Sequence, residues 1–307
     1  MHNFGRAVVS LGITLSTILA CGESTEGTDT LDDSARVGAA DSGSGTSTGD
    51  GGTKPGTGDA ATGSDAATDA PTIPTRPTGP GEPPTRTATI NANAQGFFEL
   101  QTAASGLSYT ARLPAGYVTG TPYPLVVGLH GCGDSAAHFA TWAVVPWASL
   151  DTQPYLAVSV GGRDGGCWDL GQDEAKVLEV VDDVRQMFFV HQKKVTLAGY
   201  SSGGMLAYYT GLRNAYRFAG ILIENSGMPF GDQTDAVLAA AEWKLNVAAS
   251  VHIQDGNFTI GSTRGDRDRL LGAGFPVQYR ELDGGHDGDS IDWTDFLLPK
   301  IAGFEAP

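Results

Sequence analysis

The sequence predicts an α/β protein, a mostly parallel sheet with helices on both faces. From about residue 88, short apolar runs rich in β-branched residues alternate with amphipathic stretches. The runs are continuous in apolar side chains, as expected of parallel strands buried on both faces. A glycine-rich turn at 199–203 also stands between such a run and a helical pattern, the setting of a functional strand-to-helix turn.

The elements follow in order along one predicted domain, residues 87–307. Two runs, GFFELQTAA and LSYTARLP, predict the edge strands of a meander. The buried strands are predicted at PLVVGLH (124–130), YLAVSVG, VTLAGY, AGILIENSG, ASVHIQD and PVQYREL. Helices are predicted at 173–190, 203–213, 235–246, 262–271 and 291–304. Right-handed crossovers would bring the loops after the strands to one edge of the sheet, where ligands bind.

The first 21 residues predict an export signal. Arg6 gives a short basic start, and residues 7–20 form a mostly apolar run that is short for a membrane span. The run ends in ILAC, which resembles a bacterial lipoprotein signal in which Cys21 is lipidated. A plain secretory signal is the alternative, although Ile18, not a small residue, would stand three positions before the cut. We expect an extracellular or cell-surface protein that meets a membrane only through this lipid.

Residues 22–86 predict a disordered linker. Gly, Thr, Ser, Asp, Ala and Pro dominate it, and large apolar side chains are almost missing. Such a segment cannot bury enough surface to offset its chain entropy. Its place directly after Cys21 favours a spacer over an unselected tail.

The charge balance excludes some partners. The chain has 35 acidic and 19 basic residues, a net charge of -16. Nucleic-acid binding needs a basic footprint, and an anionic membrane surface would repel this chain. We therefore expect no nucleic acid, and a substrate that is neutral or is bound without help from long-range charge. We also expect a monomer.

The stretch VTLAGYSSGGM holds the candidate nucleophile. Gly199, Ser201 and Gly203 fit the G-x-S-x-G pattern, whereas centring it on Ser202 would require glycine in place of Tyr200. The Ser201 hydroxyl would project at the N-terminus of a helix, where developing negative charge is favoured. A polar turn without catalysis is the alternative.

The stretch LHGCGD, residues 129–134, predicts an oxyanion loop. HG-type loops after an earlier strand supply one backbone N–H, and the residue after the nucleophile supplies the other. The predicted donors are the amides of Cys132 and Ser202. His130 is expected to brace the loop rather than to transfer protons.

The general base must follow the nucleophile in this fold. Only His252 and His286 do so among the six histidines. His252 lies inside a predicted strand and is interpreted as a buried structural histidine. His286 lies in the glycine-rich loop LDGGHDGDS, which can deliver an imidazole to Ser201.

The acid that orients His286 is predicted to be Asp255, which ends a strand candidate. Glu224, at the end of the preceding strand, is an alternative. Asp266 and Asp268 lie in a charged helical stretch and are expected to be solvated.

The cysteines predict one disulfide. If Cys21 carries a lipid, Cys132 and Cys167 remain as the pair that an oxidising compartment would join.

Four stretches together resemble the catalytic domain of polyhydroxybutyrate depolymerases and of feruloyl or acetylxylan esterases. They are LHGCGDSA, GGCWDLGQDEAKVLEVVDDV, VTLAGYSSGGM and DGGHDGD. The resemblance spans about residues 109–304 and implies an α/β-hydrolase fold. It also implies that Trp168, beside Cys167, lies at the active-site rim as a candidate substrate wall. A core tryptophan is the alternative. The family's acid is often followed by Val-Pro, whereas this chain reads HIQDGNFTI.

Together these features predict an exported serine esterase that forms an acyl-enzyme. The expected substrates are feruloyl or acetyl esters of polysaccharides, or polyhydroxyalkanoate polyesters. A serine peptidase and a non-catalytic carbohydrate-binding lipoprotein are the alternatives. The sequence has no H-E-x-x-H motif and no zinc-type cysteine spacing, so neither a metal nor an organic cofactor is expected.

Overall fold

The computed structural model describes residues 79–307. The predicted signal, the lipid site at Cys21 and residues 22–78 of the predicted linker lie outside this part and remain predictions. Within residues 79–307, no helix combines the length and apolar character that a bilayer crossing requires.

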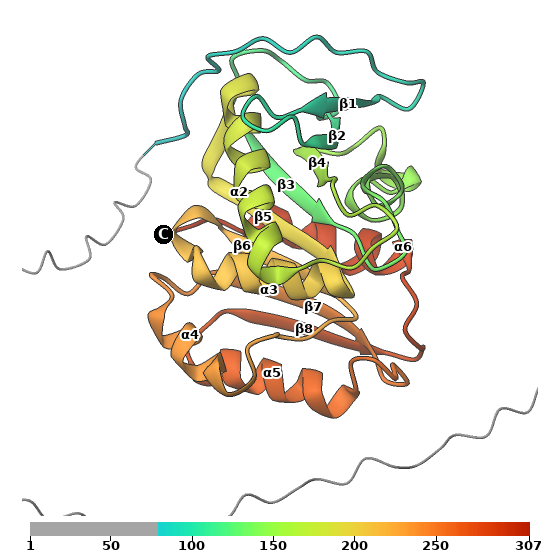
Figure 1. The fold of residues 1–307 in the computed structure, drawn as a ribbon, viewed down its shortest axis with the longest axis vertical. Coiled ribbons are helices and arrows are strands. Elements are labelled where there is room, and N and C mark those ends of the chain that lie inside the picture. The colour runs from blue at the N-terminus through green and yellow to red at the C-terminus, as the bar shows by residue number, and fades with distance from the viewer. Residues whose placement is uncertain (1–78) are drawn as a thin grey trace, which may run out of the picture. The chain divides into compact units, whose positions relative to one another are not determined.

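One eight-stranded sheet organises the described chain, in the order β1-β2-β4-β3-β5-β6-β7-β8 (Figure 1). The β1–β2 and β2–β4 pairs are antiparallel, and every other pair is parallel. The strands are β1 (Phe97–Gln101), β2 (Ser108–Arg112), β3 (Tyr123–Leu129), β4 (Leu156–Val160), β5 (Val190–Tyr200), β6 (Gly220–Glu224), β7 (Asn246–His252) and β8 (Val277–Leu282). The predicted strands are therefore confirmed, except that β8 was expected to be buried and is instead a partly exposed strand at the edge of the sheet.

The helices are α1 (Ala136–Phe139), α2 (Leu170–Met187), α3 (Ser202–Arg213), α4 (Thr234–Ala240), α5 (Ile260–Gly272) and α6 (Ser290–Asp292). A π-helical turn, Ala140–Val144, extends α1, and α6 continues through a second π-helical turn into 3₁₀ turns that end at Gly303. The predicted helix 235–246 was wrong beyond Ala240. Residues 241, 243 and 245 are buried while 242 and 244 are less so, a period of two that suits extended chain leading into β7.

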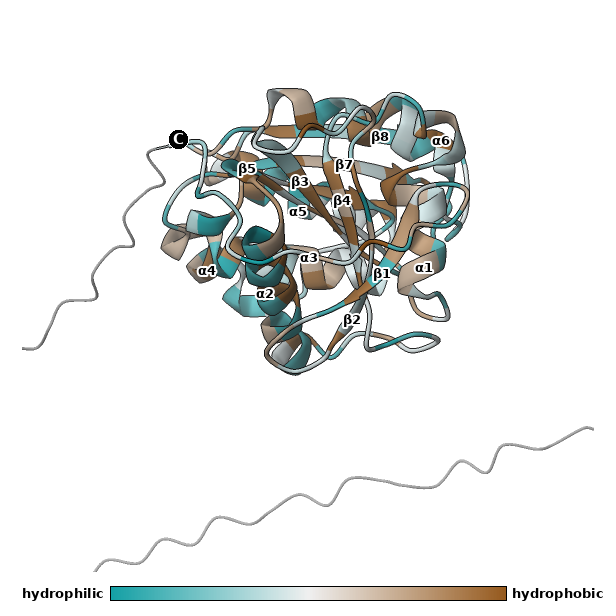
Figure 2. Ribbon diagram, turned by 90° about the horizontal axis from the view of Figure 1, so that it is seen from above, coloured by the Kyte–Doolittle hydropathy of each residue, from teal (hydrophilic) through white to brown (hydrophobic). Residues whose placement is uncertain are grey.

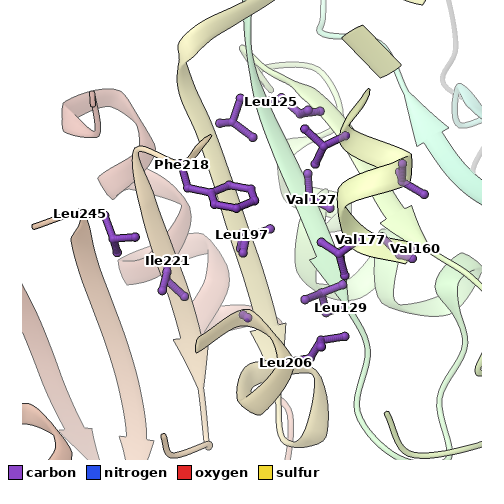
Figure 3. Packing of buried hydrophobic residues seen from close by; sticks show 14 of the residues in the cluster. Leu125, Val127, Leu129, Val160, Val177, Leu197, Leu206, Phe218, Ile221 and Leu245 are labelled. Carbon is purple, nitrogen blue, oxygen red and sulfur yellow. The ribbon is translucent and has the colours of Figure 1, made fainter. Parts of the chain in front are cut away.

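The two faces of the sheet bury separate cores. On one face, α2 and α3 cover alternate residues of β3, β5 and β6; Figure 3 shows Leu125, Val127, Leu129, Val177, Leu197, Leu206 and Ile221 from this core. On the other face, the segment 139–145 and the C-terminal helical turns cover the intervening residues, among them Val126, Ala198 and Leu222. Figure 2 shows the strands as a hydrophobic centre with more polar helices around them. The sheet is thus rigid on both sides, which fixes the loops at its carboxyl edge.

Residues 79–86, which the sequence assigned to the linker, contact α2 and β5. The backbone amides of Thr85 and Arg86 both donate to Gln186 O at 2.8 Å, and Arg86 pairs with the buried Asp183. The Gln192 amide donates to Pro80 O at 3.0 Å. These contacts are made by backbone atoms and by one ion pair. The sequence did not predict them, because such contacts do not require the large apolar side chains that the segment lacks.

Candidate active site

Ser201 occupies the sharp turn between β5 and α3. Its backbone has φ 53° and ψ -121°, a positive-φ conformation that non-glycine residues rarely adopt. Two hydrogen bonds hold the turn: the Ser201 amide donates to Glu224 O at 3.2 Å, and Ser226 Oγ donates to Ser201 O at 2.7 Å. Strain of this kind persists only where the surroundings enforce it, and it marks functional sites.

The glycines beside Ser201 allow the strand and helix to approach closely. A Cβ on Gly199 would lie 2.3 Å from Gly203 O. A Cβ on Gly203 would lie 1.9 Å from Leu129 O, the last residue of β3. Both contacts are with backbone, which cannot move aside without disturbing the sheet. The G-x-S-x-G spacing is therefore a packing requirement of this turn.

Gly203→Ala should lower the free energy of unfolding by at least about 3 kcal/mol, because the added methyl meets the β3 backbone. Urea denaturation followed by circular dichroism would measure the loss. Gly265→Ala is the matched control: it lies within α5, and a Cβ there would meet no atom within 4 Å. This control should gain about 0.5–1 kcal/mol, and equal stability of the two variants would contradict the packing argument.

The structure brings the three predicted residues of the catalytic chain together. Ser201 Oγ lies 2.8 Å from His286 Nε2, and His286 Nδ1 lies 2.8 Å from Asp255 Oδ2. The second Asp255 oxygen accepts from the backbone amides of Asn257 and Phe258 at 2.7 and 3.0 Å. The Asp255 carboxylate is buried, with 1% of its side chain exposed. Its orientation is thus fixed on both sides, and the carboxylate faces the imidazole.

Aromatic rings enclose the His286 imidazole. The Tyr200 ring stacks on it at a centroid distance of 5.4 Å, and the Phe258 ring lies 5.6 Å away. The Tyr200 hydroxyl donates to His286 O at 2.9 Å, which ties the histidine loop to the residue before Ser201. Burial raises the pKa of the Tyr200 phenol to about 12, so it remains a donor at neutral pH.

A second histidine supports the loop that carries His286. His252 is buried at the end of β7, as expected, and its Nδ1 lies 2.9 Å from Gly285 O. Its Nε2 lies 3.0 Å from Asp292 Oδ2, and Arg280 donates to the other Asp292 oxygen at 2.7 Å. This charged cluster fixes the backbone directly before His286.

The predicted oxyanion loop lies against the Ser201 turn. A Cβ on Gly131 would come 3.4 Å from Ser201 Cβ, so this loop and the serine are neighbours. Ser202 is the first residue of α3, where backbone amides have no acceptor within the helix. Among the described residues, no protein acceptor pairs with the Cys132 or Ser202 amide. Both amides therefore lack a protein acceptor, which agrees with their predicted role as oxyanion donors.

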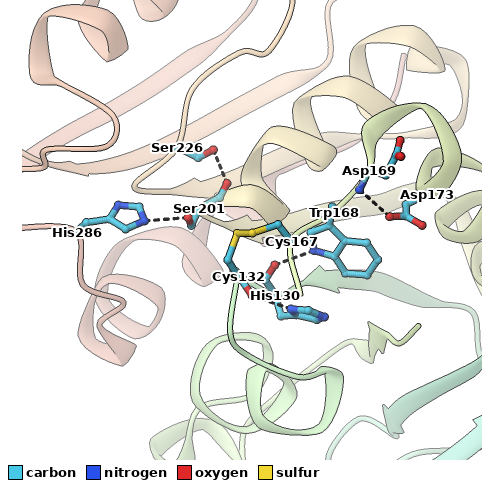
Figure 4. The surroundings of a disulfide bond; sticks show 10 residues. His130, Cys132, Cys167, Trp168, Asp169, Asp173, Ser201, Ser226 and His286 are labelled. Atoms are coloured by element: carbon cyan, nitrogen blue, oxygen red, sulfur yellow. Dashed lines mark hydrogen bonds between the residues drawn. A yellow bond between two sulfur atoms is a disulfide. The ribbon is translucent and has the colours of Figure 1, made fainter. Parts of the chain in front are cut away.

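Two links hold this loop to the segment before α2 (Figure 4). Cys132 and Cys167 form the predicted disulfide, which is confirmed. The Trp168 indole donates to His130 O at 2.7 Å, and its ring lies 4.8 Å from the His130 ring. Trp168 is 7% exposed and belongs to the main core. Its surroundings are those of a core tryptophan that braces the loop, while contact with substrate stays a prediction.

Removing the disulfide should affect both stability and rate. It closes a sequence separation of 35 residues, for which chain entropy predicts a loss of about 3–4 kcal/mol. In Cys132→Ser/Cys167→Ser, turnover of a small ester at low temperature should fall more than KM changes, because the Cys132 amide loses its fixed position. Unchanged kcat in a folded double variant would show that Trp168 alone suffices to hold the loop.

Comparison with known proteins places the fold. The S-formylglutathione hydrolase of Staphylococcus aureus superposes with a TM-score of 0.54 at 15% identity, covering 67% of this chain and 96% of that one. A ferulic acid esterase of Anaeromyces mucronatus, solved with ferulic acid, gives 0.52 at 12% identity over 66% of this chain and 88% of that one. The chain has the α/β-hydrolase fold.

One relative found by sequence and one further solved structure extend the comparison. A probable feruloyl esterase C of Aspergillus niger is 23% identical over 244 residues, which cover 69% of this chain and 90% of that protein. An acylaminoacyl peptidase of Pyrococcus horikoshii has a TM-score of 0.51 at 12% identity, with 69% of this chain covered, but this chain spans only 42% of its length. No protein-family model matches the chain.

The other carboxylates considered from the sequence lie elsewhere in the fold. Glu224 is fully buried and accepts from the Asp289 amide at 2.7 Å and from the Trp293 indole at 2.6 Å. Burial raises the pKa of its carboxyl well above the ordinary value. Asp268 is an exposed partner of Arg267, as expected. The expectation that Asp266 is solvated was wrong: it is half-buried and accepts from the Met228 amide, and burial raises the pKa of its carboxyl. Of the four carboxylates considered, Asp255 is the one that pairs with His286.

Sequence reasoning missed Asn225 as part of the site. It has φ 44°, its Oδ1 accepts from the His252 amide at 2.8 Å, and its Nδ2 donates to Asp287 O at 2.8 Å. It therefore links the ends of β6 and β7 to the His286 loop. Asparagine is one of the few residues that tolerate positive φ. An asparagine directly after a buried strand could therefore have indicated a tight turn at this position. Within residues 79–307, no set of three or more His, Cys, Asp or Glu side chains is arranged to hold a metal ion.

Proposed function

We propose that this protein is a serine carboxylic-ester hydrolase that releases feruloyl-type acyl groups from polysaccharide esters. The observation that carries the proposal is the hydrogen-bonded series from Ser201 through His286 to Asp255 at the carboxyl edge of the sheet. Several curated relatives that are called feruloyl esterase C support the substrate class, at 23–24% identity.

The reaction begins when His286 Nε2 takes the Ser201 proton as the oxygen attacks the ester carbonyl. Asp255 holds Nδ1–H toward itself and stabilises the imidazolium that forms. The Cys132 and Ser202 amides receive the oxyanion. His286 then protonates the leaving alcohol, and water activated by the same imidazole releases the acid from Ser201.

Export to an oxidising compartment belongs to the same proposal. The Cys132–Cys167 disulfide supports it, because such bonds persist mainly outside the reducing cytosol. A lipid on Cys21, followed by a spacer, would place the domain at a cell surface.

Parallel assays on methyl ferulate, p-nitrophenyl acetate, poly-3-hydroxybutyrate and a feruloyl anilide test the proposal. We expect methyl ferulate to have the highest kcat/KM. Cleavage of the anilide but of none of the esters would identify a peptidase. Lack of labelling by a fluorophosphonate in folded protein would refute catalysis through Ser201.

A further inference from the structure

Trp147 is the most exposed large hydrophobic side chain of the described residues, with 75% of its surface in contact with solvent. It opens a short 3₁₀ turn, Trp147–Ser149, between the π-helical turn after α1 and β4. Residues 79–307 provide no ring partner for it. An isolated indole in this setting presents a wide apolar face to a ligand.

A groove of about 310 Å³ adjoins the indole. Its lining combines polar Asn93, Gln95 and Thr141 with apolar Phe97 and Leu150. None of the described residues that line it carries a charge. The groove therefore combines an aromatic surface with amide and hydroxyl groups.

The walls of the groove are held in place by protein contacts. Arg112 donates from Nε to Gln95 O at 2.9 Å and from one terminal nitrogen to Leu150 O at 2.7 Å, which joins the two sides. Asn93 Oδ1 accepts from the amides of Gln95 and Phe97, each at 3.0 Å. This fixes the Asn93 amide plane. Among the described residues, no acceptor pairs with Asn93 Nδ2, which remains available as a donor.

We propose that Trp147 and this groove bind a neutral polysaccharide chain. A sugar ring has an apolar C–H face that can pack on an indole, and its hydroxyls can pair with side-chain amides and with Thr141. A neutral polymer also avoids repulsion by a protein of net charge -16. A polyester surface would match a broader apolar patch, without amides beside the aromatic ring.

The groove is connected to the active site through the π-helical turn Ala140–Val144. Thr141 lines the groove, and the next residue, Trp142, packs its ring 5.6 Å from the Tyr200 ring. Trp142 Nε1 also donates to Asp134 Oδ2 at 2.9 Å, at the end of the oxyanion loop. The inference extends the proposed function, since the groove would retain the polymer whose ester group Ser201 attacks.

The test measures binding without hydrolysis. Full-length Ser201→Ala protein is passed over insoluble neutral arabinoxylan and over poly-3-hydroxybutyrate particles, with and without Trp147→Ala. We expect retention on arabinoxylan to weaken about tenfold on removal of the indole. Asn93→Ala should give a smaller loss. The matched control is Leu271→Ala, which removes another exposed apolar side chain, 50% exposed, from α5; it should bind as the parent does.

The outcomes separate this inference from the proposed function. Trp147→Ala in the otherwise unaltered protein should hydrolyse methyl ferulate at the parental rate. Trp147-dependent retention supports the groove even if no ester is cleaved. Equal retention of parent and Trp147→Ala on arabinoxylan, retention on the polyester alone, or no retention of the parent on arabinoxylan would overturn it.

Discussion

Ser201→Ala should lower kcat for methyl ferulate by roughly a millionfold, the loss typical of removing a serine nucleophile from a complete triad. The hydroxyl 2.8 Å from His286 Nε2 is the group that would form the acyl-enzyme, and no other hydroxyl of this turn contacts that nitrogen. Single-turnover measurement and labelling with a fluorophosphonate would check the result. The fold should persist, because a β-carbon is already accommodated at this position.

Ser202→Ala is the matched control within the same turn. The Ser202 hydroxyl is buried and has no hydrogen-bond partner among residues 79–307. Its proposed role uses the backbone amide, which alanine retains, so at least about a tenth of the activity should remain. Comparable losses in both variants would contradict the division of roles between the two serines.

Asp255→Asn should lower kcat by about 10⁴-fold. Asparagine can still accept from the Asn257 and Phe258 amides through one oxygen, which preserves the local turn. The amide group that would then face His286 Nδ1 favours the wrong imidazole tautomer. Steady-state kinetics, together with a thermal melt to confirm folding, would measure the effect.

Asp268→Asn serves as its control. This carboxylate is exposed and pairs with Arg267, away from the imidazole. Activity should be unchanged. If Asp255→Asn were as active as Asp268→Asn, the orienting acid would have to be another residue.

Much of this geometry could be predicted because it follows from local rules. The glycines at 199 and 203 predicted the turn, because close packing of a strand against the following helix excludes a side chain at these positions. His286 and Asp255 followed from their order after Ser201 and their places after strands. The apolar runs were sufficient to predict the strands of the sheet, because both faces of the sheet are buried.

What could not be predicted depends on contacts between distant segments. The role of Trp168 was ambiguous because a tryptophan has both an apolar body and a donor, and only the position of His130 O shows where the donor points. The helix predicted to extend to residue 246 ends at Ala240. The prediction was too long because an alanine-rich stretch has high helix propensity. The burial of every second residue beyond Ala240 depends on the neighbouring strands, which the local sequence does not show.

The contacts of residues 79–86 show at which edge of the sheet the N-terminal segment meets the domain. These residues lie beside the last turn of α2 and the beginning of β5, at the amino edge of the sheet (Figure 1). Ser201 and His286 lie at the carboxyl edge. The polypeptide therefore joins the domain on the side opposite the reacting groups.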